Sequence, residues 1–128
     1  MEIIGIVILA LSGLLLLMVG IQRLSNPIKT FAKSSGITVP QDADLLNELR
    51  GVASVQLFSG IIILLGTLMS QMTFASHLVA ALVFLGFAVG RMVSMSADGK
   101  PNKKIAQGLI FELVLGAANL FMLLQNTI

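Results

Sequence analysis

The fold of this protein is decided by the stretch IAQGLIFELVLGAANLFMLL, residues 105–124. A stretch of this length matches the ~20 apolar residues with which an α-helix crosses a hydrocarbon core of ~30 Å. One carboxylate, Glu112, interrupts it, and Gly108, Gly116 and Asn119 share a helical face with that carboxylate. We therefore expect this face to line the inside of a membrane bundle, where Glu112 meets an arginine.

Three further windows have the same character, namely Ile3–Ile21, Val52–Met69 and Phe74–Met95. The chain of 128 residues is 56% hydrophobic and only 11% charged, whereas a soluble globular domain is about a quarter charged. The windows are too evenly apolar for barrel strands, which alternate over ~10 residues. The composition thus predicts an all-α polytopic membrane protein, with residues 1–128 forming a single four-transmembrane-helix bundle. Since no basic segment precedes the first window, we expect an uncleaved span.

The segment after the first window predicts a short helix at the membrane interface, over about residues 27–35. Asn26 and Pro27 are typical of a helix start, and Gly36 is typical of a helix stop. Thr38 and Gln41 have the spacing of a capping box, which predicts that the second long helix begins near Val39. Asn102 is expected to cap the fourth.

The basic residues predict the topology. All eight lie near the ends of windows or in connections that share one side of the membrane: Arg23, Lys29, Lys33, Arg50, Arg91, Lys100, Lys103 and Lys104. The positive-inside rule makes that side cytoplasmic and puts both termini on the non-cytoplasmic side.

Polar side chains cluster in the cytoplasmic half of the predicted bundle. Glu112 lies roughly 10 Å inside the helix end at ~1.5 Å per residue, and it is too short to reach the interface. It must therefore pair, accept hydrogen bonds or stay protonated. The candidate polar cluster or ligand-binding residues are Asn47, Arg50, Arg91, Ser94, Asp98 and Glu112, with Gln56 and Asn119 as secondary polar positions.

Three interpretations of this cluster stay open. Glu112 could bridge Arg91, Arg50 or both, and so join three helices as a structural network. The two arginines could instead form a cationic pocket for an anionic lipid headgroup or an isoprenoid phosphate, because arginine pairs well with phosphate. Glu112 could also serve a small proton-coupled carrier or a lipid-modifying enzyme. We expect Glu112→Leu to destabilise the bundle more than His77→Leu.

Other functions lack their residues. The absence of cysteine excludes thiolate chemistry, and a single histidine excludes a multi-histidine metal or haem site. We expect no catalytic residue, no cofactor, no metal and no nucleic acid. His77 is expected at the outer membrane interface, and Gly86 with Gly90 form a G-x-x-x-G helix-packing signature. The expected partners are membrane lipids, including anionic ones, and a protein partner or a second copy of the chain.

Several short motifs together resemble a known family. They are Asn47-Glu48-Leu49-Arg50-Gly51, Gly90-Arg91-Met92-Val93-Ser94, Asp98-Gly99-Lys100-Pro101 and Glu112. Their combination is similar to that of small bacterial four-helix membrane proteins known only as a domain of unknown function. The resemblance implies a multi-pass protein of the bacterial inner (cytoplasmic) membrane and brings no reaction. We expect a non-enzymatic accessory or scaffold protein, or a binder of an anionic lipid.

Overall fold

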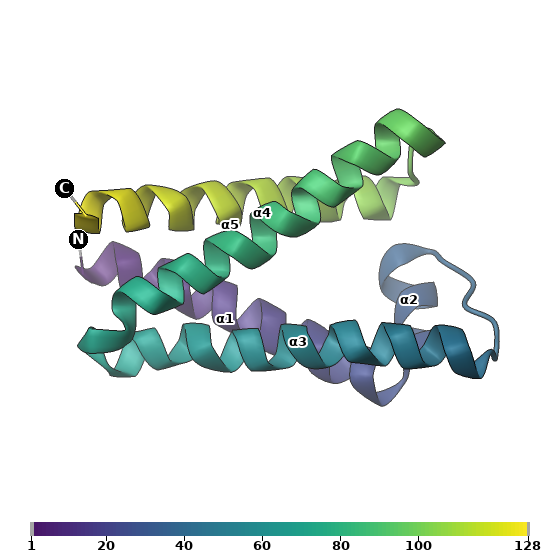
Figure 1. Ribbon diagram of the computed structural model, residues 1–128, viewed down its shortest axis with the longest axis horizontal. Helices are drawn as coiled ribbons and strands as arrows, with labels where there is room; N and C mark the ends of the chain where they lie inside the picture. The colour runs from purple at the N-terminus through teal and green to yellow at the C-terminus, as the bar shows by residue number, and fades with distance from the viewer. Residues whose placement is uncertain (1, 128) are drawn as a thin grey trace.

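The structure, a computed structural model, describes residues 2–127, and it contains helices and no strand over that range. The elements are α1 (Glu2–Ser25), α2 (Pro27–Ser35), α3 (Ala43–Leu68), the 3-10 turn η1 (Ser70–Met72), α4 (Thr73–Asp98) and α5 (Lys103–Thr127) (Figure 1). Four of them, α1, α3, α4 and α5, are long and apolar enough to cross a membrane. The predicted all-α fold with four membrane-length helices and one short helix is confirmed.

The helix ends follow local sequence chemistry in three of the four predicted places. Asn26 Oδ1 accepts a hydrogen bond from the backbone N–H of Lys29 at 3.3 Å, and Gly36 ends α2 in the left-handed conformation with φ 68°. Only glycine adopts that conformation without strain. Asn102 Oδ1 accepts a hydrogen bond from the N–H of Ile105 at 2.9 Å, as expected of a cap.

The predicted start of the second long helix is wrong. The helix begins at Ala43, and its cap is Asp42, whose Oδ1 accepts a hydrogen bond from the N–H of Asp44 at 3.0 Å. Pro40 explains the difference, because a proline disfavours the helical conformation of the residue before it, here Val39. The capping box inferred from Thr38 and Gln41 therefore does not form.

Helices α1 and α3 pack against each other at very short range. A Cβ atom built on Gly20 would lie 2.6 Å from the backbone nitrogen of Leu57, and one built on Gly60 would lie 2.7 Å from that of Leu17. Only glycine permits such backbone approach, which is how helices associate in lipid without a hydrophobic driving force. The small residues of the first helix thus form a packing face.

The pair α1/α3 and the pair α4/α5 meet at one end of the molecule and separate towards the other (Figure 1). We call the end that holds η1 and the outer ends of α1 and α5 the closed end, and the end that holds α2 the open end. The buried residues of α4 lie between Ser76 and Ala88, so none of its last ten residues is fully buried. A small core of Leu9, Ile63 and Phe84 holds the pairs together.

The glycine motif of α4 does not pack helices in this chain. Gly86 and Gly90 are exposed, and a Cβ atom on either would meet nothing within 4 Å. Both lie where α4 has turned away from α3, so the predicted packing role is wrong. A G-x-x-x-G pattern permits close approach and does not require it.

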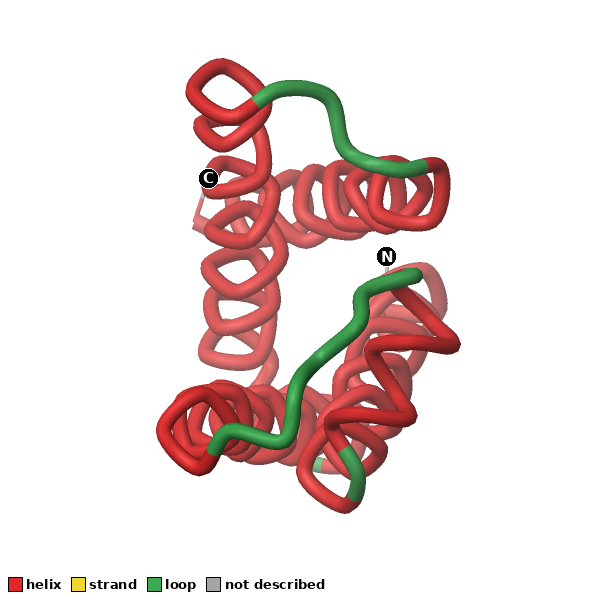
Figure 2. Tube along the Cα trace, turned by 90° about the vertical axis from the view of Figure 1, so that its right-hand side faces the viewer, coloured by secondary structure: helices red, strands yellow, loops and turns green. Residues whose placement is uncertain are grey.

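Helix α2 and the connections beside it cover the open end. Asn102 Nδ2 donates a hydrogen bond to the carbonyl of Ser35 at 2.9 Å, and Lys104 Nζ donates one to the carbonyl of Lys33 at 2.8 Å. These bonds connect α2 to the start of α5. Figure 2 looks onto the open end and shows the loop from α2 to α3 crossing it.

Candidate functional site

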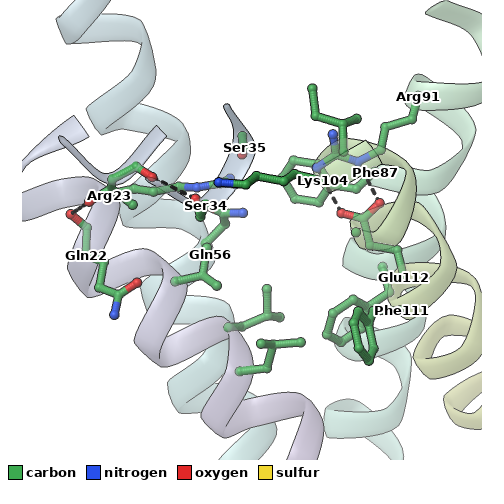
Figure 3. Close-up of a pocket in the computed structure, with 17 residues that line it drawn as sticks. Gln22, Arg23, Ser34, Ser35, Gln56, Phe87, Arg91, Lys104, Phe111 and Glu112 are labelled. Carbon is green, nitrogen blue, oxygen red and sulfur yellow. Dashed lines mark hydrogen bonds and ion pairs between the residues drawn. The ribbon is translucent and has the colours of Figure 1, made fainter. Parts of the chain in front are cut away.

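A fork-shaped ion pair joins α4 to α5. Arg91 Nε lies 2.8 Å from Glu112 Oε1, and Arg91 Nη2 lies 3.1 Å from Glu112 Oε2. The side chains are 26% and 14% exposed, respectively. Two parallel charge-assisted bonds fix both the distance and the angle between the partners. The geometry therefore accounts for a glutamate inside an apolar helix, and Figure 3 shows the two side chains facing each other.

The pair lines a cavity of about 180 Å³ among α1, α2, α3, α4 and α5, which we call the inner cavity. Three of its lining residues, Arg23, Arg91 and Lys104, are cations, and one, Glu112, is an acid. The remaining polar lining residues are Gln22, Thr30, Ser34, Ser35 and Gln56. The described wall of the cavity thus carries more positive than negative charge.

Arg23 is the cation that sequence reasoning did not place in the cluster. It stands in the last turn of α1, and its guanidinium carbon lies 4.4 Å from the centroid of the Phe31 ring on α2. Its Nε is buried and has no hydrogen-bond partner in the described chain. Cation–π contact compensates part of the lost hydration but leaves the N–H unsatisfied. Figure 3 shows Arg23 across the inner cavity from Arg91 and Glu112.

Gln56 of α3 is the most enclosed polar residue near this site. It is 4% exposed, and its Oε1 finds no donor among residues 2–127. A buried carbonyl oxygen without a donor is uncommon in folded proteins and calls for an explanation.

A second, wider hollow opens between α3 and α4, with a volume of about 710 Å³; we call it the α3–α4 groove. Its apolar wall consists of Phe31, Ile37, Leu49, Val52, Val55, Val83, Gly86, Phe87 and Gly90. Arg23, Ser35, Gln56, Phe87 and Arg91 line both the groove and the inner cavity. The two spaces are therefore neighbours across one shared polar wall.

The other predicted residues of the open end lie outside this wall. Arg50 Nη1 donates a hydrogen bond to the carbonyl of Leu24 and lies 3.5 Å from that of Ser25, so the structure does not bring Arg50 to Glu112. Asn47 is exposed and lines neither space.

Ser94 and Asp98 form a local pair on α4. Ser94 Oγ donates a hydrogen bond to Asp98 Oδ2 at 2.9 Å on an exposed surface. Of the two, Ser94 also lines the α3–α4 groove.

Asn119 belongs to a different network near the closed end. Its Nδ2 donates hydrogen bonds to Ser12 Oγ at 2.9 Å and to the carbonyl of Leu115 at 2.8 Å, and its Oδ1 lies 2.9 Å from His77 Nδ1. Because Oδ1 can only accept, His77 carries its proton on Nδ1. The three side chains of Ser12, His77 and Asn119 are all fully buried.

His77, which the sequence predicts at the outer membrane interface, is fully buried between the helices. It shares a helical face with Ala80, Ala81 and Phe84, which are all buried against the other helices. The spacing of these positions along α4 was the available signal, and it indicates a core face that includes the histidine.

Four apolar helices, an ion pair within the membrane-length region and a polar wall between two hollows define a small multi-pass membrane protein. The chain belongs to the family described as a domain of unknown function (DUF4345), which matches residues 6–123. The resemblance inferred from the motifs is thereby confirmed at the level of the family. Comparison with curated proteins and comparison with solved structures each returned no match.

Proposed function

We propose that this protein is a non-enzymatic membrane protein that binds the headgroup of an anionic lipid in the inner cavity. The observation that carries the proposal is the buried Nε of Arg23, which has no hydrogen-bond partner in the described chain. An unsatisfied guanidinium N–H is costly away from water, and phosphate oxygens match its donor geometry. Glu112 occupies Arg91 but leaves Arg23 and its neighbours for a ligand.

The α3–α4 groove supports a lipid rather than a free anion. It shares Arg23 and Arg91 with the inner cavity, and most of its other lining residues are apolar. The exposed backbone of Gly86 and Gly90 leaves room beside α4. Its volume of about 710 Å³ lies in the ~300–1,000 Å³ range of ligand sites. An acyl or isoprenoid chain in the groove would extend from a phosphate held at the shared wall.

We further propose that the open end faces the cytoplasm of a bacterial cell, which puts the ends of α1 and α5 on the non-cytoplasmic side of the inner membrane. The basic residues on α2 and on the connection before α5 support this orientation, since positive charge favours the cytoplasmic side and its anionic lipids. A reporter that works only outside the cytoplasm should be active when fused after α5. Activity of a cytoplasmic reporter at the same place would reverse the orientation.

The lipid site is tested by comparing Arg23→Gln with Arg50→Gln, because both variants remove one arginine near the same end. Native mass spectrometry in detergent, with added phosphatidylglycerol, measures the affinity of each. A charge-assisted hydrogen bond contributes ~1.5–3 kcal/mol, so Arg23→Gln should weaken binding about tenfold or more. Arg50→Gln should bind like the unmodified protein.

Equal lipid binding by Arg23→Gln and the unmodified protein would contradict the proposal. The pair of Arg91 and Glu112 would then join α4 to α5 without a ligand. An accessory or scaffold role would account for that result.

A further inference from the structure

We infer that the lipid headgroup carries a free hydroxyl group beside its phosphate, and that Gln56 selects for it. This inference rests on the proposed function, because it describes the ligand of the same site. Gln56 would accept a hydrogen bond that the ligand donates, whereas the arginines would donate hydrogen bonds that the ligand accepts.

Gln56 borders both spaces of the candidate site. Its side chain lines both the inner cavity and the α3–α4 groove, so it lies at the wall where a headgroup would meet its chain. It is 4% exposed, and its Oε1 lacks a donor in the described chain. The Gln56 side chain thus borders both spaces and carries a buried acceptor that no described residue satisfies.

The unsatisfied atom of Gln56 is an amide carbonyl oxygen. An amide carbonyl accepts hydrogen bonds and cannot donate them. A phosphodiester bears only acceptors, so a headgroup without another polar group would satisfy Arg23 and leave Gln56 Oε1 unsatisfied. A hydroxyl on the headgroup supplies the missing donor.

The positive charge of the site limits which headgroups can donate to Gln56. A phosphomonoester has its second pKa near ~6 and is mostly without a proton at neutral pH, so it offers no reliable donor. An ammonium headgroup would donate, but it would enter a cavity that already holds Arg23, Arg91 and Lys104. A phosphodiester with free hydroxyls, as in a phosphatidylglycerol headgroup, supplies both an anion and a neutral donor.

A pair of lipids separates these requirements. Phosphatidylglycerol and phosphatidylmethanol with the same acyl chains carry the same charge, and only the first has headgroup hydroxyls. Native mass spectrometry titrations of the full chain with each should show about tenfold tighter binding of phosphatidylglycerol. Gln56→Met, which keeps the shape of the side chain, should abolish this preference and leave binding of phosphatidylmethanol unchanged.

Gln71→Leu is the matched control, because Gln71 is an exposed glutamine on η1 at the closed end. It should keep the full preference. The folding of Gln56→Met is checked by thermal unfolding without lipid, and its Tm should equal or exceed that of the unmodified protein, since the variant removes an unsatisfied buried group.

Each other result has a defined meaning. Equal binding of the two lipids by the unmodified protein would overturn the inference and leave the proposed function standing. Equal weakening of both lipids in Gln56→Met would also overturn it, because the amide would then not distinguish hydroxyls. Binding of neither lipid would refute the proposed function itself.

Discussion

The closed end and the open end of this molecule both contain polar side chains from several helices, but these side chains differ in charge, burial and hydrogen bonding. At the closed end, Ser12, His77 and Asn119 are neutral, fully buried and bonded to one another. At the open end, Arg91 and Glu112 are charged, partly exposed and next to two hollows. The first arrangement is what a bundle needs to hold its helices in register. The second leaves a donor, Arg23 Nε, and an acceptor, Gln56 Oε1, without partners in the described chain.

The unsatisfied atoms at the two ends also differ in kind. His77 Nε2 is buried without a partner in the described chain, but it belongs to a neutral ring. Arg23 Nε belongs to a cation, and an unsatisfied donor on a charged group costs more than an unsatisfied neutral acceptor in an apolar environment. The comparison therefore favours a structural role for the histidine network and supports the proposal of a ligand at the arginine.

Glycine has opposite consequences in the packed and the open regions. A Cβ atom on Gly66 would overlap Ser76 Oγ, and one on Gly116 would lie 2.6 Å from Leu85 Cδ2. A Cβ atom on Gly90 or Gly108 would meet nothing within 4 Å. Gly66 and Gly116 therefore permit close packing of helices, whereas Gly90 and Gly108 face space that no described residue fills.

The largest effect is expected from Gly60→Leu, which would separate α1 from α3. The new Cβ would lie 2.7 Å from the backbone nitrogen of Leu17 and 2.9 Å from the carbonyl oxygen of Gly13, and backbone atoms cannot move aside as a side chain can. Overpacking costs ~1–3 kcal/mol and sometimes more, so we expect a loss of about 3 kcal/mol or failure to fold. Thermal unfolding in detergent measures it.

Gly90→Leu is the control for that experiment. It adds the same side chain where there is open space, so the Tm should not fall, while phosphatidylglycerol binding should weaken as the groove fills. Equal melting of the two variants would contradict the distinction between packed and open regions.

The next largest effect is expected from Asn119→Leu at the closed end. The change removes three hydrogen bonds, to Ser12, to His77 and to the carbonyl of Leu115. The bonds to Ser12 and His77 cross between helices, where each contributes ~0.6 kcal/mol on average and up to ~1.7, so the free energy of unfolding should fall by about 1–3 kcal/mol. Lipid binding should not change. Asn47→Leu, on an exposed site, should melt like the unmodified protein, and an equal loss there would argue against the network.

A smaller effect on stability is expected from Glu112→Gln at the open end. Arg91 is 26% exposed and flexible enough to turn towards the interface, so breaking the pair should cost less than about 1 kcal/mol. Binding of phosphatidylglycerol should rise several-fold, because the only carboxylate among the described lining residues of the inner cavity is gone. Titration and thermal unfolding of the same sample measure both. A Tm loss larger than that of Asn119→Leu would make the pair primarily structural.

The structure thus predicts a larger loss of stability from breaking the His77–Asn119 network than from breaking the Arg91–Glu112 pair. The sequence suggests the reverse, namely that Glu112→Leu destabilises more than His77→Leu. The depth of Glu112 along its helix and its need for a partner were predictable, because they follow from helix rise and side-chain length. The helix caps at Asn26 and Asn102 were equally predictable, because a cap needs only its own turn. These features depend on a few neighbouring residues.

The features that were missed depend on how helices lie against each other. Arg23 was counted as a topology signal, and only the return of α2 over the end of α1 places Phe31 beside it. Arg50 was placed near Glu112 from depth alone, but depth does not say which way a side chain leaves its helix. Gly86 and Gly90 permit close packing, yet the divergence of α4 from α3 leaves them uncovered.

The smallest effect is expected from Arg50→Gln. Arg50 donates to the carbonyl of Leu24 in the last turn of α1, where positive charge also interacts favourably with the helix dipole. An exposed interaction of this kind contributes ~0.3–1 kcal/mol, so the Tm should change little. Hydrogen exchange of the backbone amides in the last turn of α1 should become faster in Arg50→Gln. Lys100→Gln, which changes an exposed residue on the connection between α4 and α5, is the control and should leave exchange in that turn unchanged. Loss of phosphatidylglycerol binding in Arg50→Gln, to the extent expected for Arg23→Gln, would move the site from the shared wall to the exposed face of α3.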